Sequence, residues 1–576
     1  MTRPALYSLL VSAVLFQAGD PALSEAPAPE APPPTLEIRL EPSSLGLEVE
    51  LRFTADVADA TVAAVPEWGG SRLEEGLMTD VRIVDAEGGA KPAKPTGQLG
   101  QWRLDNAAGA HLSLRYRIPR NQYIRGIDGD SYYKPVVTPK LTHLIGHQSL
   151  LLPDAWGTQD KIAVSVRWEN LPEGHHAVTS FGVGPGPHRA TLRLGALRGG
   201  LFIAGAGALF RGSGDDPVHI FVAEGPWRFE PKVLADLAQR IVPAEREFFR
   251  ERDAGAFLVS AIAIGPEDAD YLSYGGTSLH DAFATFLMPT LEMDDFGRGG
   301  LSYLLAHEKA HTWIGGHVSS GEEPETAGYW FSEGVTDYYT PRLQYRAGLL
   351  DAAGVLESWN ALLSEYVLSP VAYAPNSAIT DGFWTDRDLQ RLPYTRGAAV
   401  SLFLDQTERR RTGGASRLDT VLLDLIDGVR RGEQQQFTNA ELRGALESAG
   451  FTAPQLDAAF ATVLDGSPLD WPDDLLAPCA ELTWRESTAF DAGFEVDEST
   501  GEVLSVDPEG PAHRAGLRPG DQLAGWSIHY GETTRPVEVQ RRSDGDLEDI
   551  RFLPVGPAHK VPAFELADVS ACAAML

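Results

Sequence analysis

Two histidines with three residues between them, His307 and His311, enclose a glutamate in the segment His-Glu-Lys-Ala-His. On a helix, residues four apart lie on one face, so both imidazoles could bind one cation. Glu308 lies one step round the helix, next to the position that the imidazoles leave open. Glycines at 299–300 and 315–316 and good helix formers between them predict a helix over 301–313. We therefore expect a metal site, the alternative being two surface histidines and a solvated glutamate.

A hydrolytic zinc site needs a third protein ligand and an open position for water. The best candidate is Glu333, which follows His311 by 22 positions, enough for a loop and the start of a second helix. Asp337 falls one turn further on the same face. It could accept a hydrogen bond from the distal nitrogen of a ligand histidine and fix the tautomer of that ring. The alternative for Asp337 is a solvated helix charge.

These residues predict hydrolysis by a zinc-activated water. Zinc lowers the pKa of its bound water towards about 7 and polarises a carbonyl oxygen. Glu308 would take the proton of the water and pass it to the leaving amine. A further group must stabilise the oxyanion, and the sequence offers Tyr394, at the start of an apolar helix. Local composition alone favours a packed aromatic side chain at that position.

The arrangement of elements predicts several domains, since 576 residues exceed a single hydrophobic core. Residues 36–225 are expected to form a β-rich, β-sandwich-like domain, with alternating strands at 36–40, 47–53, 112–118 and 162–168. Residues 226–478 are expected to form an α-rich domain that begins with some strand. Its expected elements are a strand at 256–264 and helices at 233–249, 301–313, 329–339, 355–367, 397–411, 417–428, 439–448 and 454–464. Short strands and turns return in residues 480–572.

Three segments together resemble the glycyl-aminopeptidase family of gluzincin metallopeptidases. They are the His-Glu-Lys-Ala-His motif, the stretch Trp-Phe-Ser-Glu-Gly-Val-Thr-Asp-Tyr-Tyr at 330–339, and Pro-Tyr-Thr-Arg-Gly-Ala at 393–398. The resemblance implies a β-rich N-terminal domain, a thermolysin-like (α+β) catalytic domain and a C-terminal PDZ domain. It also implies one zinc ion on His307, His311 and Glu333, with Glu308 as general base and Tyr394 as the transition-state tyrosine.

The predicted PDZ-like domain rests on the run Gly-Pro-Ala-His-Arg-Ala-Gly-Leu-Arg-Pro-Gly-Asp at 510–521, which is similar to the helix and turn of bacterial PDZ domains. Gly493 and Phe494 would belong to its carboxylate-binding loop, whose backbone N–H groups could hold the C-terminus of a peptide. The alternative is a small β-domain that serves only for packing.

One departure from the family concerns substrate specificity. Family aminopeptidases have a glutamate that binds the free α-amine of the substrate, in a Gly-rich strand before the zinc helix. This chain has Tyr-Gly-Gly-Thr-Ser-Leu-His-Asp at 274–281, with Gly275 and Gly276 but no glutamate. The strand could still align an extended peptide through its backbone. An aminopeptidase acting on short peptides is the leading hypothesis. The alternatives are an endopeptidase or narrow-specificity peptidase, and a PDZ-based peptide-binding scaffold with weak catalysis.

Charge and the N-terminal segment limit partners and location. The net charge of −33 argues against nucleic acid and anionic lipid, because both need clustered cations. Residues 1–24 resemble a signal peptide, with a basic start, a short apolar core and small residues near position 24. A Pro-rich tether at 25–35 follows. We expect an exported protein, periplasmic or secreted; membrane attachment would require that the signal segment stays uncleaved.

The two cysteines, Cys479 and Cys572, enclose the last predicted domain. An oxidising compartment would permit a disulfide between them, and two unpaired thiols are the alternative. Two cysteines alone cannot form a zinc finger.

Overall fold

The computed structural model describes residues 33–85, 88–121, 133–252, 254–265, 274–292, 300–414, 418–497, 500–543, 546–573 and 576. The predicted signal peptide and most of the predicted tether lie outside this range. The described residues fall into two compact units. The sheet unit comprises residues 33–243 and 251–292, and the helical unit comprises 244–250 and 300–576. In the described part of the chain, no helix has the length and hydropathy needed to cross a membrane.

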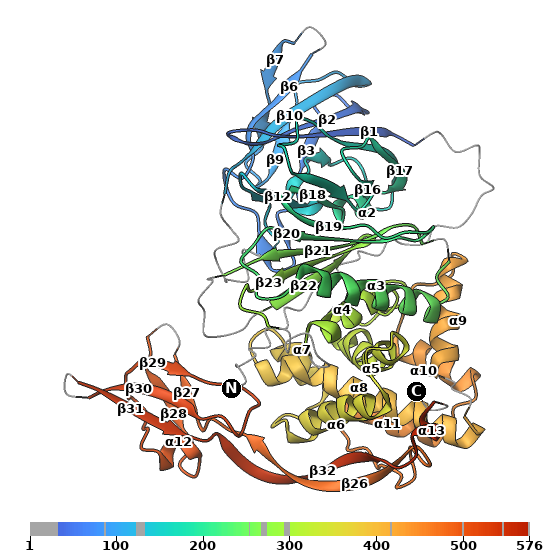
Figure 1. Cartoon of the computed structure of the whole chain (residues 1–576), viewed down its shortest axis with the longest axis vertical. Helices are drawn as coiled ribbons and strands as arrows, with labels where there is room; N and C mark the ends of the chain where they lie inside the picture. Colours follow the sequence, from blue (N-terminus) through green and yellow to red (C-terminus); the bar gives the residue numbers. More distant parts are fainter. Residues whose placement is uncertain are drawn as a thin grey trace. The chain divides into compact units, whose positions relative to one another are not determined.

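A seven-stranded sheet organises the sheet unit (Figure 1). Its strands alternate between buried and more exposed residues, as expected where one face of a sheet covers a core. The core includes Leu36, Val49, Leu114 and Val164, one from each of the four predicted strands, all of which are present. In sheet order, the strands are β17 (His188–Arg193), β14 (Lys161–Trp168), β1 (Thr35–Pro42), β2 (Gly46–Ala55), β10 (Ala110–Pro119), β6 (Thr79–Val84) and β7 (Ala90–Pro92).

Smaller sheets complete the β-rich region. A five-stranded sheet has the order β11 (Val136–Val137), β12 (Leu141–Ile145), β18 (Leu201–Gly205), β15 (His176–Thr179) and β16 (Gly182–Val183). A four-stranded sheet has the order β13 (Leu152–Pro153), β3 (Thr61–Ala63), β9 (Gln101–Arg103) and β8 (Lys94–Pro95), and β4 (Glu67–Trp68) pairs with β5 (Ser71–Arg72). Two short helices are α1 (Gly146–Ser149) and α2 (Leu194–Arg198). The N-terminal region is thus rich in sheet, and its β-sandwich-like character remains a prediction.

A further five-stranded sheet joins strands from both sides of the predicted boundary at residue 225. Its order is β19 (Gly207–Phe210), β20 (Val218–Ala223), β21 (Phe257–Ala263), β23 (Ala282–Leu287) and β22 (Tyr274–Leu279). The three central strands run parallel and the two outer pairs are antiparallel. The predicted strand at 256–264 is β21. Gly275 and Gly276 lie in β22, the strand at the edge of this sheet.

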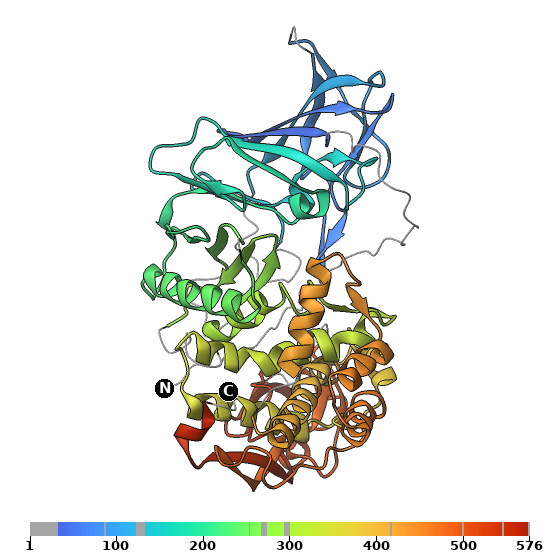
Figure 2. The same cartoon turned by 90° about the vertical axis from the view of Figure 1, so that its right-hand side faces the viewer.

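Helices make up most of the region between residues 300 and 466 (Figure 2). Each predicted helix has a counterpart. The helices are α3 (Pro231–Phe248), α4 (Leu301–Ala310), a 3₁₀ turn (Glu325–Gly328), a π-helical turn (Trp330–Val335), α5 (Thr336–Arg346), α6 (Ala352–Leu368), α7 (Asn376–Gly382), α8 (Arg387–Thr412), α9 (Leu418–Arg430), α10 (Asn439–Ser448) and α11 (Ala453–Asp465). The two-residue strands β24 (Ser319–Ser320) and β25 (Gln436–Phe437) pair with each other.

Helix α8 begins ten residues before its predicted start. Asp386 caps its N-terminus, and the Asp386 carboxylate accepts hydrogen bonds from the backbone N–H groups of Asp388 and Leu389. Pro393 lies within the helix. The early start places Tyr394 inside the helix rather than at its beginning.

Residues 480–566 return to strand. A long antiparallel ribbon of β26 (Ala480–Phe490) and β32 (Val555–Leu566) leads to a small β-rich lobe (Figure 1). The lobe contains β27 (Phe494–Val496), β28 (Val503–Val506), the short helix α12 (Pro511–Arg514), β29 (Leu523–Ser527), β30 (Val537–Ser543) and β31 (Asp546–Phe552). It has its own core, which includes Val503, Leu517, Val539 and Ile550. The C-terminal region is β-rich as predicted, and its assignment as a PDZ domain remains a prediction.

A disulfide joins Cys479 and Cys572, with Cα atoms 4.6 Å apart. Cys572 belongs to the short helix α13 (Val569–Cys572), which follows the ribbon. The bond therefore ties the two ends of residues 480–571 together at the base of the ribbon. Of the two alternatives left open by the sequence, the structure shows the bonded one.

Candidate metal centre

Helix α4 presents both histidines of the motif on one buried face. His307 is 3% exposed and His311 is 9% exposed. The regular helix ends at Ala310, and His311 is its C-cap with helical backbone angles. Its Nδ1 lies 3.1 Å from the carbonyl oxygen of Ile314 in the following turn. If Nδ1 carries the proton, that bond leaves Nε2 of His311 free to bind a cation.

Glu333 lies in the π-helical turn that precedes α5. A π-turn is wider than an α-turn and is commonly found at functional sites. The turn packs closely on α8 through two glycines. A Cβ atom on Gly397 would lie 2.1 Å from the carbonyl oxygen of Trp330, and one on Gly334 would lie 2.4 Å from the Cα of Gly397. The local sequence favours an ordinary helix at 329–339, whereas the wider turn depends on this contact with a distant helix.

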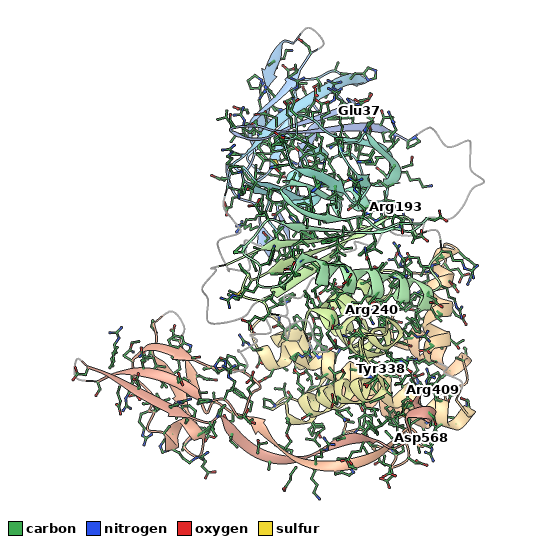
Figure 3. All side chains as sticks on the ribbon, in the orientation of Figure 1. Glu37, Arg193, Arg240, Tyr338, Arg409 and Asp568 are labelled. Atoms are coloured by element: carbon green, nitrogen blue, oxygen red, sulfur yellow. A yellow bond between two sulfur atoms is a disulfide. The ribbon has the colours of Figure 1, made fainter. Side chains whose placement is uncertain are left out.

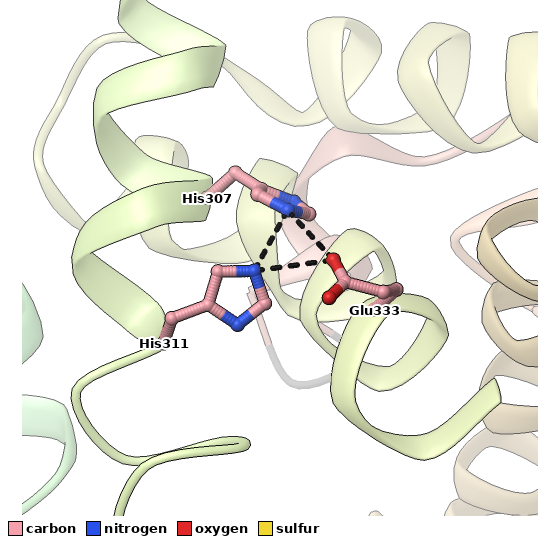
Figure 4. Close-up of side chains that lie close together, drawn as sticks. All are labelled: His307, His311 and Glu333. Atoms are coloured by element: carbon pink, nitrogen blue, oxygen red, sulfur yellow. Dashed lines mark hydrogen bonds and ion pairs between the residues drawn. The ribbon is translucent and has the colours of Figure 1, made fainter. Parts of the chain in front are cut away.

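The three predicted ligands converge (Figure 4). The Nε2 atoms of His307 and His311 are 3.0 Å apart. Oε2 of Glu333 lies 3.4 Å from Nε2 of His307 and 3.2 Å from Nε2 of His311. All three side chains are buried and offer one ligand atom each within 4.8 Å of one another. Two imidazole nitrogens and a carboxylate oxygen are a donor set suited to a divalent transition metal.

Asp337 lies behind His307, on the side away from the other two predicted ligands. Its side chain is 1% exposed, and its Oδ1 lies 2.9 Å from Nδ1 of His307. The hydroxyl of Tyr303 donates to the same oxygen at 2.7 Å, and Nη1 of Arg391 lies 3.5 Å from Oδ2. This arrangement holds the ring of His307 so that Nε2 points at the ligand cluster. Arg391 is held in turn by the carboxylate of Glu365.

Sequence reasoning missed Tyr303 and Arg391, although both left a signal. Tyr303 precedes His307 by four residues, and Arg391 precedes Tyr394 by three, so each pair shares a helix face. Neither residue has a role in the motif itself, and their contact with Asp337 depends on how three helices pack.

The electrostatics of the cluster favour a positive charge between its carboxylates. Burial by itself would lower the pKa of His307, but Asp337 and Glu333 outweigh burial and raise that pKa to about 10. Burial would raise the pKa of Glu333, but the two histidines hold it well below its usual range. In the absence of metal, a proton on the histidines satisfies the carboxylates. A cation held by the same atoms would replace that proton.

Glu308 and Tyr394 lie at the same site. Glu308 is 4% exposed, and its negative charge contributes to raising the pKa of both His311 and Tyr394. The ring of Tyr394 lies 6.3 Å from that of His307, centroid to centroid. Burial raises the pKa of Tyr394 well above its usual value, with Glu333 acting in the same direction. The hydroxyl therefore stays protonated and can donate a hydrogen bond.

The other predicted binding residues belong to β22 and to the C-terminal lobe. Gly276 accommodates the ring of Phe283, since a Cβ atom there would lie 2.3 Å from Cζ of that ring. Gly493 has a φ of 73°, a conformation that favours glycine. Phe494 begins β27 and packs against the core of the small C-terminal lobe.

Comparison with known proteins gives two positive findings. The family model described as M61 glycyl aminopeptidase matches residues 301–378, the segment that contains all three ligands and Asp337. The solved structure of an aminopeptidase N family protein from Idiomarina loihiensis matches with a TM-score of 0.68 and 15% identity. That match covers 93% of this chain and 99% of the other, and it shows a shared fold. No curated protein matches the chain.

The matching segment and the cluster within it support a peptidase. The match over residues 301–378 confirms the resemblance to glycyl aminopeptidases drawn from the sequence motifs.

Proposed function

We propose that this protein is an exported, zinc-dependent metallopeptidase that acts as an aminopeptidase on short peptides. The observation that carries the proposal is the buried His307, His311 and Glu333 cluster, within the segment that matches a peptidase family. One zinc ion fits this donor set of two imidazoles and one carboxylate. When bound, it would supply a Lewis acid that polarises the scissile carbonyl and acidifies water.

The side chains around the cluster divide the remaining chemistry between them. Glu308 accepts a proton from water as the water oxygen bonds to the carbonyl carbon. It then delivers that proton to the amide nitrogen as the C–N bond breaks. Tyr394 donates a hydrogen bond to the carbonyl oxygen as negative charge develops there. Asp337 keeps His307 oriented and its distal nitrogen protonated.

The test begins with metal content and one isosteric variant. We expect about one zinc per chain by atomic absorption, and hydrolysis of short unblocked peptides. Glu308→Gln should lower kcat by about 10²-fold to 10⁴-fold with zinc content unchanged. Glu447→Gln, whose side chain is 51% exposed, is the matched control and should behave as wild type. A wild-type protein without metal, or a Glu308→Gln variant with full activity, would refute the proposal.

Aminopeptidase specificity comes from the family, and one observation favours a second candidate, an endopeptidase. The strand β22 and the turn after it contain no glutamate to bind a substrate amine. The residues present there include Asp281, whose Oδ2 lies 3.4 Å from Nε2 of His280. Paired peptides with a free and an acetylated N-terminus separate the two candidates. Loss of all cleavage on acetylation supports the aminopeptidase, and equal cleavage supports the endopeptidase.

We also propose that the C-terminal lobe binds the C-terminus of a peptide, as a PDZ-like domain would. Among the described strands, β27 pairs with β28 alone and leaves its second edge open to a peptide strand. Fluorescence anisotropy should show binding of peptides with a free C-terminal carboxylate and weaker binding of amidated ones. If Phe494→Glu abolishes binding but leaves turnover intact, recruitment and catalysis are separate functions, and the scaffold alternative is excluded.

Export is proposed from residues 1–24, and the disulfide between Cys479 and Cys572 supports it, because such bonds persist in oxidising compartments. Mass spectrometry of protein isolated from its own cells should give a mature N-terminus near residue 25. Recovery of the intact chain from the cytoplasmic fraction would refute export.

A further inference from the structure

Arg396, on helix α8, differs in its partners from Arg391, the arginine described at the metal cluster. Arg396 is 0% exposed. Its Nη1 donates to the carbonyl oxygen of Ala374 at 2.5 Å. Within the described part of the chain, its Nε and Nη2 atoms have no hydrogen-bond partner, although both are buried. Two N–H donor groups of a buried guanidinium are thus left for another acceptor.

No carboxylate among the described residues pairs with Arg396. Buried arginines elsewhere in the helical unit do have such partners: Arg342 and Arg409 both bond to Asp419. Burial lowers the pKa of Arg396 to about 10, which still leaves the guanidinium charged at neutral pH. A buried charge without a counterion costs several kcal/mol. A site of this kind favours an anion from the surroundings.

Tyr366, on the neighbouring helix α6, provides a second donor. Its side chain is 3% exposed, and its hydroxyl has no hydrogen-bond partner among the described residues. Burial raises the pKa of Tyr366 to about 12, and the charge of Arg396 opposes that increase. The hydroxyl therefore remains protonated within range of the charge of Arg396. A charged donor and a neutral donor, both buried, suit a small monovalent anion.

We propose that Arg396 and Tyr366 bind one chloride ion inside the helical unit. A carboxylate at the end of a peptide would need access from solvent, and Arg396 has no exposed surface. A divalent anion would leave an uncompensated negative charge there, because one cation serves the site. The ion neutralises a charge on the same helix that bears Tyr394, and it fixes the packing of α6 against α8.

Thermal unfolding of the full chain tests the proposal without any measurement of activity. Sodium chloride is titrated against sodium gluconate at constant ionic strength, so that general screening stays fixed. An ion that binds only the folded state raises Tm in a saturable way. We expect a rise of about 2 °C or more at saturation, which bromide should reproduce.

Three variants assign the effect to the site. Arg396→Met and Tyr366→Phe should each reduce or abolish the chloride-dependent rise in Tm. Arg410→Met on the same helix, where the arginine side chain is 46% exposed, is the matched control and should keep the full rise. Should Arg396→Met fail to fold, Tyr366→Phe still reports on the site.

A crystal grown in bromide provides a direct observation, with an anomalous peak expected between Arg396 and Tyr366. Equal Tm values in chloride and gluconate, an undiminished chloride effect in Tyr366→Phe, or bromide crystals without that peak would overturn the proposal. None of these outcomes depends on whether the protein is a peptidase.

Discussion

Replacing Asp337 by asparagine should weaken metal binding without removing a ligand. Asparagine has nearly the same shape, so its Oδ1 can still accept from Nδ1 of His307 and from the hydroxyl of Tyr303. What is lost is the negative charge of a carboxylate that is 1% exposed. The variant therefore removes the charge of Asp337, including its pairing with Arg391, and keeps an acceptor for His307.

The size of the effect follows from the contacts. A hydrogen bond to a charged group contributes about 1.5–3 kcal/mol, and a neutral one about 1 kcal/mol. Converting the Asp337 bond to His307 from charged to neutral should thus cost about 1–2 kcal/mol of metal-binding free energy. That corresponds to a rise in the zinc Kd of about 5-fold to 30-fold. Measured effects of removing comparable supporting groups, about 10-fold to 100-fold, are of the same order.

The assay is competition for zinc between the metal-free protein and a chromophoric chelator. Glu365→Gln is the matched control, because it removes the other carboxylate partner of Arg391 and does not contact His307. Its zinc Kd should stay within about twofold of wild type. Circular dichroism of each metal-free variant checks that the fold is retained. A zinc Kd for Asp337→Asn equal to that of wild type, or an equal loss in Glu365→Gln, would refute the reasoning.

Three further predictions concern the fold that holds the site. Gly397→Ala should lower the unfolding free energy by about 1–3 kcal/mol and weaken metal binding, because the added Cβ overlaps the π-helical turn. The control Gly444→Ala, with no atom within 4 Å of the added Cβ, should raise the unfolding free energy by up to about 1 kcal/mol. Replacing both Cys479 and Cys572 by alanine opens a link between residues 93 positions apart and should lower the unfolding free energy by about 4–5 kcal/mol, seen as a lower Tm. Burial lowers the pKa of His143 to about 4, so between about pH 4 and 6.5 the unfolded chain binds the extra proton and stability falls as pH falls. Urea unfolding at pH 7.5 and pH 5 measures the difference in unfolding free energy between the two conditions. His143→Gln should make that difference about 2 kcal/mol smaller. The control His559→Gln, on an exposed stretch of β32, should leave the difference unchanged.

The parts of the site that were predictable from the sequence are those set by local spacing. His307 and His311 share a helix face because they are four residues apart, and Asp337 follows Glu333 by one turn. The π-helical turn at Glu333 was not predictable, because it depends on the glycine contact with α8, some 60 positions away along the chain. The disulfide could not be decided either, since pairing depends on the separation of two distant Cα atoms.

A similar division applies to the fold. Alternating apolar residues located the strands β1, β2, β10 and β14, because each covers a core with one face. The same pattern could not say which strands are neighbours. β1 pairs in parallel with β14, more than 100 residues later in the chain, and antiparallel with β2. The predicted start of α8 at residue 397 was wrong, because the Asp386 cap sets the actual start ten residues earlier.

The position of Asp337 at the metal cluster depends on other buried charges that α5 contacts. Tyr338 donates to Asp405 at 2.6 Å, and Arg342 forms two bonds to Asp419 at 2.8 and 2.9 Å. Tyr338, labelled in Figure 3, belongs to α5. Buried ion pairs contribute little net stability, because desolvation offsets their attraction. They do, however, fix the rotation of a helix about its axis and its position along that axis, since any shift would leave a buried charge unpaired. We therefore interpret the network as holding α5 in the position at which Asp337 contacts His307. A hydrophobic contact of equal area would allow α5 more freedom to rotate or slide.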